Sequence, residues 1–336
     1  MKTLKEREWF FSQEREPVEV QMPIPEYDIY RLKTTRQVIE DITVDSGLGK
    51  APVTIGATAD LHFNFCDMKD REDEELKYTE QCRLWLAHQK SVPAAIAALE
   101  AADYCDAAVV LGDVLDYLSN GAKELTKRHI IKKYPDIMMA LGGHDYLKQM
   151  QTKLPEQLPL ETRLDMIREF WPHDIHYYSR RIGESVLAVV IDNSQSKYLQ
   201  GQAQKLKADM DAAREEGRAV LIFQHEPITP FDPTLGSVLA NIANGGAGNS
   251  HNFSQSTIVL GVKPTDEATG EVLDLIRTGA DVIKGVFTGH LHSQYFVNIK
   301  ACRIENGKEI PTDIPQYIIS GNPYFEAGIV ARITVK

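Results

Sequence analysis

Aspartate and histidine recur in five short groups along the sequence, and each group directly follows an apolar run. Carboxylate oxygen together with imidazole nitrogen suits Mn, Fe, Zn or related ions, whereas oxygen donors alone would suit Mg or Ca. A carboxylate can also bridge two ions, and two ions about 3.5–4 Å apart form the clamp used for in-line attack on phosphorus. The groups are Asp60-Leu61-His62, Gly112-Asp113-Val114-Leu115-Asp116, Gly143-His144-Asp145, His225 and Gly289-His290-Leu291-His292.

Six apolar runs rich in β-branched residues alternate with helix-like stretches from residue 52 onward. Continuous apolar strands with helical spacers predict sheets that are covered on both faces, which is an α/β layer arrangement. Ligand sites in such sheets lie outside the carboxyl ends of the strands, so we expect the strand-end groups to converge. The predicted strands are 53–59, 107–112, 136–142, 186–192, 219–224 and 282–289, and the predicted helices are 91–102, 121–134, 201–217 and 266–279.

The composition along the chain indicates an N-terminal extension followed by one main domain. Residues 1–50 are polar and predicted to be irregular, with a strand at 37–44, and we interpret them as an extension packed on the main domain. Residues 51–336 are predicted to form a single domain with a loop insertion around 230–260 that is rich in Gly, Asn and Ser. We expect this loop to lie over the site.

The overall composition argues against several classes of function. A net charge of −11 disfavours binding to long nucleic acids, because such binding needs Lys and Arg to neutralise phosphates. The first residues lack the apolar core of a signal peptide and no later segment is long enough to span a bilayer, so we expect a cytoplasmic protein with no membrane partner. The four cysteines lack CxxC spacing, which argues against a disulfide framework and a zinc ribbon.

The ordered series DxH, GDxxD, GxHD, a lone His after a strand, and GHxH resembles the calcineurin-like metallophosphoesterases, over roughly residues 54 to 335. Each motif alone is a weak signal, but all five in order, each after an apolar run, make a strong one. The stretches "SVLAVVIDNSQ", "AVLIFQHEP" and "PQYIISGNPYFEAGIVARITV" are similar to the middle and the closing strands of that family. The resemblance implies an α/β fold in which a two-sheet β-sandwich is flanked by helices, in α/β/β/α layers.

The resemblance also implies a ligand set for two divalent or trivalent metal ions. His144 would lie beside the leaving group as proton donor or electrostatic stabiliser, oriented by Asp145. Asp116 would hold a ligand in place, as groups behind metal ligands commonly do. One ion would be held by Asp60, His62, Asp113 and His292, and the other by Asp113 as the bridge, His225 and His290.

The chain departs from the family pattern at Gly143, where the resemblance implies an Asn that ligates the second ion. Because glycine has no side chain, three interpretations are open. Water fills the second site and the ion binds more weakly, another group supplies the ligand, or hydrolytic activity has been lost. Asn64 and the asparagines of 241–252 are candidate substitutes, and His251 in the same loop is a candidate substrate contact.

Two functions are therefore expected from the sequence. In the first, a phosphoesterase hydrolyses a phosphate mono- or diester of a small molecule through metal-activated water. In the second, the chain is a metal- or ligand-binding module of the same fold whose hydrolytic activity is weakened or lost because of Gly143. The first is favoured because six of the seven implied ligands and the pair His144 and Asp145 remain. The sequence does not specify the substrate, the native metal or the oligomeric state.

Overall fold

The computed structural model describes residues 2–13, 17–24, 29–83, 88–147, 158–228, 266–292, 294–322 and 326–336. Helices and strands alternate through most of these residues, and a 3-10 turn over His144–Tyr146 follows one of the strands. The helices are α1 (Leu4–Ser12), α2 (Glu74–Cys82), α3 (His88–Ala102), α4 (Asn120–Thr126), α5 (Leu160–Arg168), α6 (Gln202–Glu216) and α9 (Glu267–Thr278). The strands are β1 (Val18–Ile24), β2 (Ile29–Val44), β3 (Val53–Thr58), β4 (Ala107–Leu111), β5 (Met138–Ala140), β6 (Tyr177–Ile182), β7 (Val186–Ile191), β8 (Ala219–Phe223), β9 (Ile283–Thr288), β10 (Tyr295–Glu305), β11 (Lys308–Ile318) and β12 (Ala327–Val335).

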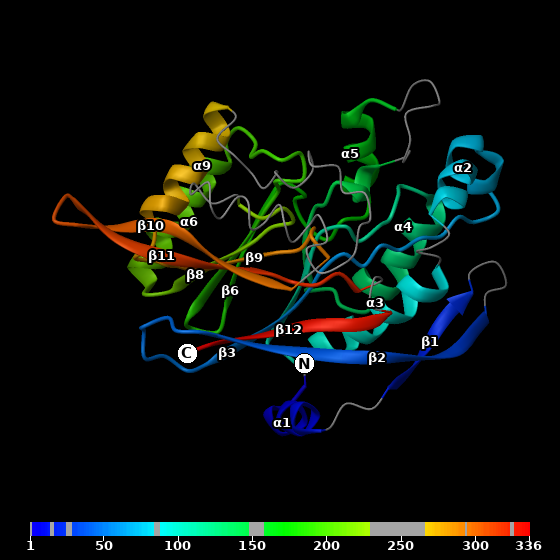
Figure 1. Cartoon of the computed structure of the whole chain (residues 1–336), viewed down its shortest axis with the longest axis horizontal. Coiled ribbons are helices and arrows are strands. Elements are labelled where there is room, and N and C mark those ends of the chain that lie inside the picture. Colours follow the sequence, from blue (N-terminus) through cyan, green and yellow to red (C-terminus); the bar gives the residue numbers. More distant parts are fainter. Residues whose placement is uncertain are drawn as a thin grey trace.

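The strands of the described residues form two mixed sheets of six strands each (Figure 1). The first sheet has the order β1-β2-β12-β3-β4-β5, and the second has the order β10-β11-β9-β8-β7-β6. Parallel pairing joins β3, β4 and β5 in the first sheet and β7, β8 and β9 in the second. The carboxyl ends of these parallel strands therefore lie at one edge of each sheet.

Each central strand divides its side chains between two cores, because successive side chains of a strand point to opposite faces. In β4, Val109 and Leu111 pack between the two sheets, whereas Val110 packs on the outer side with residues of α3, α4 and α5. In β8, Leu221 packs between the sheets and Ile222 packs outward with residues of α6 and α9. The helices thus cover the two outer faces (Figure 1), and the predicted α/β/β/α sandwich is confirmed.

All six strands and three of the four helices predicted from the sequence are present within a few residues of the expected bounds. The fourth helix, predicted at 121–134, is α-helical only to Thr126 and continues as a π-helix over Lys127–Ile131. The strands β6, β10 and β11 were not predicted from hydrophobic periodicity, because each carries polar residues on an exposed or half-exposed face. The predicted loop around 230–260, including His251, lies outside the described residues. Within the described ranges, no helix combines the length and the apolarity needed to cross a membrane.

The prediction that residues 1–50 are largely irregular is wrong for most of that segment. It forms α1 and an antiparallel pair of β1 and β2, and β2 pairs in parallel with β12 from Arg36 to Val44. The strand predicted at 37–44 is present as the second half of β2, whereas residues 29–36 of the same strand were not predicted. Two buried residues of β2 are polar, which weakens its hydrophobic pattern. Thr35 donates to the carbonyl of Glu326 at 3.0 Å, and Gln37 donates to the carbonyl of Ala97 at 2.7 Å. The segment therefore supplies two strands of the first sheet.

Candidate metal centre

The aspartate and histidine groups follow the carboxyl ends of β3, β4, β5, β8 and β9. Backbone hydrogen bonds tie the loops after β3 and β4 together. The amide of Asp60 donates to the carbonyl of Gly112 at 3.2 Å, and the amide of His62 donates to the carbonyl of Asp113 at 2.9 Å. The loop after β9 joins them, because the amide of His290 donates to the Asp60 carboxylate at 3.1 Å. The strand-end groups thus converge, as the sheet geometry predicts.

Six side chains form two groups of potential ligands that share one carboxylate. Asp113 Oδ2 lies 3.2 Å from His225 Nε2 and 3.7 Å from His62 Nε2, so this carboxylate stands between the two groups. Within each group the ligand atoms lie within 4.8 Å of one another. The first group comprises Asp60, His62, Asp113 and His292, and the second comprises Asp113, His225 and His290.

The orientation of His62 is fixed by a buried network behind it. His62 Nδ1 donates to Asp116 Oδ1 at 2.9 Å, because an ionised carboxylate can only accept. Its Nε2 lone pair is then directed toward the first group, where His292 Nε2 lies 3.2 Å away. Asp116 also accepts from Arg83 and from Asn64. Asp116 therefore holds the ring of a candidate ligand in place. Arg83 could not be predicted from the strand ends, because it follows α2 rather than a strand.

The orientation of His225 is fixed in the same way by backbone. Its Nδ1 donates to the carbonyl of Leu111 at 2.8 Å, so Nε2 is the nitrogen that remains to bind a proton or a cation. Nε2 faces Asp113 Oδ2 and lies 3.2 Å from Nδ1 of His290. Two imidazole nitrogens that converge beside a carboxylate are an arrangement that suits a cation between them.

The backbone at the candidate ligands lies in an uncommon conformation. Among the described residues, Asp60, His62, Asp113, His290 and His292 all have φ between 45° and 71°. Left-handed backbone is unfavourable for residues with a Cβ and persists only where the surrounding structure determines it. It occurs here at the residues that follow strands, which turns their side chains toward the shared edge.

Burial makes the charges of the centre interdependent. Burial raises the pKa of Asp60 to about 7, in spite of the nearby His225. Burial alone would also raise the pKa of Asp113, but the charges of His225 and His144 outweigh it and hold that pKa well below its usual value. Conversely, burial would lower the pKa of His225, but the charge of Asp113 and the hydrogen bond to it raise the pKa to about 10. Protonated imidazole thus supplies positive charge that the buried carboxylates require, and metal cations would supply the same charge.

His144 lies beside the first group, at the start of the 3-10 turn after β5. Its amide donates to Asp113 Oδ1 at 2.9 Å, and its Nδ1 donates to the carbonyl of Asp116 at 2.8 Å. The prediction that Asp145 orients the His144 ring requires correction. The Asp145 carboxylate instead accepts from the amides of Gly142 and Leu115, at 2.7 and 2.8 Å, and so holds the loop rather than the ring.

Gly143 does not need to be glycine for backbone reasons. Its φ of −63° and ψ of −33° are helical, and among the atoms of the described residues a Cβ there would meet only the carbonyl oxygen of Ser194, at 3.6 Å. Asn64, a candidate substitute for the missing ligand, uses both ends of its side-chain amide in other hydrogen bonds. Its amide donates to the carboxylate of Asp116 at 2.8 Å, and its oxygen accepts from the hydroxyl of Tyr117 at 3.1 Å. Asn64 is therefore wrong as a replacement ligand and belongs to the network behind His62.

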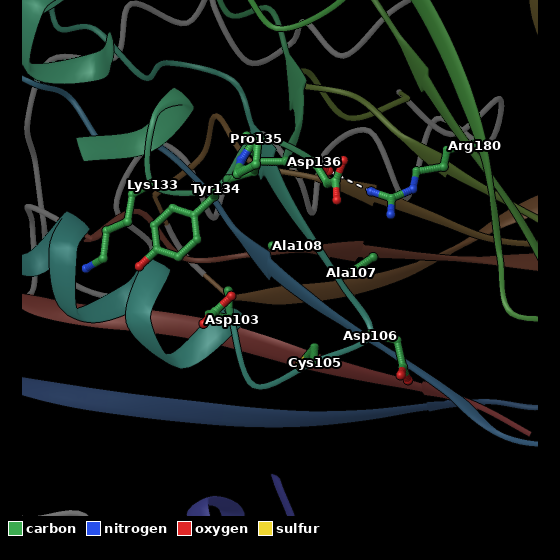
Figure 2. Close-up of a pocket in the computed structure, with 12 residues that line it drawn as sticks. Asp103, Cys105, Asp106, Ala107, Ala108, Lys133, Tyr134, Pro135, Asp136 and Arg180 are labelled. Atoms are coloured by element: carbon green, nitrogen blue, oxygen red, sulfur yellow. Dashed lines mark hydrogen bonds between the residues drawn. The ribbon is translucent and has the colours of Figure 1, made fainter. Parts of the chain in front are cut away.

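A cavity of about 250 Å³ lies away from this centre, between the end of α3, the turn before β5 and β6. It is lined by Ala107, at the start of β4, whereas Asp113 follows the end of that strand. Figure 2 shows the side chain of Arg180 reaching toward Asp136, whose carbonyl accepts from it at 2.6 Å. The cavity is thus at the opposite edge of the sheet and contributes nothing to the metal centre.

No protein-family model matches the sequence, and no curated protein matches it either. Among solved structures, the chain is similar to a dimetal phosphatase from Danio rerio, with 16% identity and a TM-score of 0.41 over 82% of this chain and 90% of that one. It is also similar to a purple acid phosphatase from seeds of yellow lupin (Lupinus luteus), with 9% identity and a TM-score of 0.44 over 92% of this chain and 57% of that one. A candidate 5′-nucleotidase from Staphylococcus aureus, in complex with alpha-ketoglutarate, has 10% identity and a TM-score of 0.36 over 80% of this chain and 54% of that one. The chain spans little more than half the length of the last two proteins.

Proposed function

We propose that this chain is a calcineurin-like metallophosphoesterase that binds two metal cations and hydrolyses a phosphate mono- or diester of a small molecule. The observation that carries the proposal is the pair of ligand groups joined at Asp113. Their nitrogen and oxygen donors favour Mn, Fe or Zn over Mg or Ca. When bound, two adjacent cations lower the pKa of a water molecule and neutralise charge on the phosphoryl oxygens. The net charge of −11 supports a small substrate rather than a nucleic acid.

The other residues of the centre orient the ligands and move a proton. Asp116 and the carbonyl of Leu111 fix the rings of His62 and His225 with Nε2 directed inward. His144 is fixed through Nδ1, so its Nε2 is the atom that remains for a proton transfer to the leaving group. Burial lowers the pKa of His144, which strengthens it as an acid once it is protonated.

A second candidate function is a metal- or ligand-binding module of the same fold with weakened or lost hydrolysis. One observation favours it, namely that the position of Gly143 offers no side chain to the second group although the backbone would accept one. This alternative predicts one cation per chain, or none, even when metal is in excess.

Metal content separates the two functions. Protein purified without chelator is analysed for bound elements before and after loading with manganese. Near two ions per chain supports the phosphoesterase, whereas one ion or fewer after loading favours the binding module.

Turnover of an aryl phosphate then tests the assignment of residues. Asp113→Ala should lower the rate at least about a thousandfold and His290→Ala should remove the second ion, because metal stabilisation of the transition state amounts to several kcal/mol. His176→Ala is the matched control, since it breaks a histidine–aspartate contact of 2.7 Å outside the centre. Near-normal rates and metal content in Asp113→Ala would show that the assignment is wrong.

A further inference from the structure

A buried carboxylate adjoins the candidate centre without belonging to either ligand group. Glu226 follows His225 directly and is only 5% exposed. Hydrogen bonds from the backbone and the side chain of Ser196 reach the carboxylate, but its Oε2 has no hydrogen-bond partner in the described part of the chain. An unpartnered oxygen of a buried carboxylate is costly and needs an explanation.

The position of Glu226 is imposed by its neighbours rather than by its own side chain. The amide of Glu226 donates to Asn193 Oδ1 at 3.0 Å, and its carbonyl accepts from Asn193 Nδ2 at 2.7 Å and from Gln224 Nε2 at 2.7 Å. This clamp joins the loop after β8 to the loop after β7. Because the backbone is held at both its donor and its acceptor, the buried carboxylate is a fixed feature of this edge.

The same loop after β7 also borders the space beside Gly143. Within the described part of the chain, the carbonyl oxygen of Ser194 is the nearest atom to a Cβ placed at Gly143, at 3.6 Å, and it accepts from the hydroxyl of Tyr146 at 2.9 Å. Residues 193–196 therefore contact both Glu226 and the turn that begins at Gly143. The loop after β7 thus links the turn that lacks a side chain to the backbone of Glu226, which directly follows His225, a member of the second ligand group.

We propose that Glu226 is a positioning residue for the second cation and compensates for the side chain that Gly143 lacks. The proposal rests on the proposed function, since it concerns the same dinuclear centre. Glu226 is not assigned as a direct ligand, because its carboxylate does not join the groups whose atoms lie within 4.8 Å of one another. It acts through its negative charge and as acceptor for a hydrogen bond from a water molecule that fills the space at Gly143.

The test is a double-mutant cycle on metal affinity. Wild type, Glu226→Gln, Gly143→Asn and the double variant are stripped of metal and titrated with Mn²⁺ in a calorimeter, which resolves a first and a second binding event. Glu226→Gln should weaken the second event about tenfold, the lower end of the effect expected for groups behind metal ligands, and should leave the first unchanged. In the Gly143→Asn background the same substitution should have little effect, because the amide already serves the second cation.

The outcomes of the titration separate the role of Glu226 from the proposed function. The unchanged first event shows that a variant is folded, and Glu226→Ala, which removes both charge and acceptor, should weaken the second event at least as much as Glu226→Gln. Wild-type affinity for both ions in Glu226→Gln and Glu226→Ala overturns the role of Glu226 and leaves the phosphoesterase standing. An equal loss in both backgrounds also overturns it, since a merely structural carboxylate would behave in this way. Absence of any Mn²⁺ binding by wild type refutes the proposed function itself.

Discussion

Replacement of Arg83 by Met tests whether the network behind His62 is held together by charge. Arg83 Nε donates to Asp116 Oδ2 at 2.9 Å, and Nη2 of the same guanidinium donates to Asp116 Oδ1. The side chains of Arg83 and Asp116 are 10% and 0% exposed, so water screens the pair only weakly. Removing one member of a buried pair costs about 3–5 kcal/mol. Because His62 and Asn64 still donate to Asp116 in the variant, we expect the lower end of that range, about 3 kcal/mol.

The destabilisation should depend on pH with a definite sign. Burial alone would raise the pKa of Asp116, but hydrogen bonds from Arg83 and His62 outweigh burial and hold it well below the usual 3.8. A carboxylate whose folded pKa is depressed stabilises the fold above its unfolded pKa, and the stabilisation is lost as pH falls through the folded pKa. Without Arg83 the folded pKa rises. The difference in stability between wild type and Arg83→Met should therefore be full above about pH 4 and should shrink below it.

The assay is urea unfolding of chelator-treated protein between pH 3 and pH 7. Arg181→Met is the control, because Arg181 pairs with Glu216 on the surface and its side chain is 54% exposed. A solvent-screened pair of this kind contributes little, so the control should change stability only slightly at any pH. The reasoning is refuted if Arg83→Met loses no more stability than the control, or if its loss is the same at pH 3 as at pH 7.

Two further predictions concern packing at the centre and a histidine outside it. Gly142→Ala should destabilise the protein by about 1–3 kcal/mol and weaken metal binding, because a Cβ there would overlap the Asp113 carboxylate. The control Gly143→Ala should be nearly neutral, because its Cβ has room. Equal shifts of the melting temperature in the two variants would contradict this prediction. Burial, together with the charges of Arg128 and Lys133, lowers the pKa of His129 to about 4 in the folded protein. As the pH falls, the unfolded chain is protonated at this histidine before the folded protein is. The free energy of unfolding should therefore decrease as the pH falls from 6.5 to about 4. His129→Gln should flatten the decline in unfolding free energy over this window, and an unchanged slope would count against the shift.

The ligand groups could be predicted because a strand end is visible in a sequence. An apolar run that stops at Asp60, Asp113 or His225 places a polar group at a sheet edge, and parallel pairing brings such edges together. The second half of β2 was predicted at 37–44, but its first half and β1, which pairs with it, were not. In that first half Thr35 is buried although it is polar, because its hydroxyl donates to the carbonyl of Glu326. Hydrophobic periodicity measures apolarity rather than burial, so it misses strands of this kind.

Contacts that depend on three-dimensional folding could not be predicted. Arg83 lies 33 positions before Asp116 in a stretch with no apolar run, and only the packed structure brings the two together. Asn64 was noted in the sequence because it lies two positions after His62, but nothing in that spacing indicates that its side-chain oxygen accepts from the hydroxyl of Tyr117. The role assigned to Asp145 was incorrect for the same reason, because sequence adjacency to His144 does not determine which backbone amides a carboxylate accepts from.

The left-handed backbone at the candidate ligands links the fold to the chemistry of the centre. Asp60, His62, Asp113, His290 and His292 each have φ between 45° and 71°, and such a residue costs roughly 1 kcal/mol or more. Aspartate and histidine tolerate this region better than β-branched residues, so the residue types that suit metal ligands also suit the turn. The packing of the cores on either side of the strands must therefore offset the cost of several unfavourable turns and of two buried carboxylates, Asp60 and Asp113, at one edge of the sheets. Cations that neutralise these carboxylates would relieve the electrostatic part of that cost, so metal binding and folding stability should be coupled in this protein.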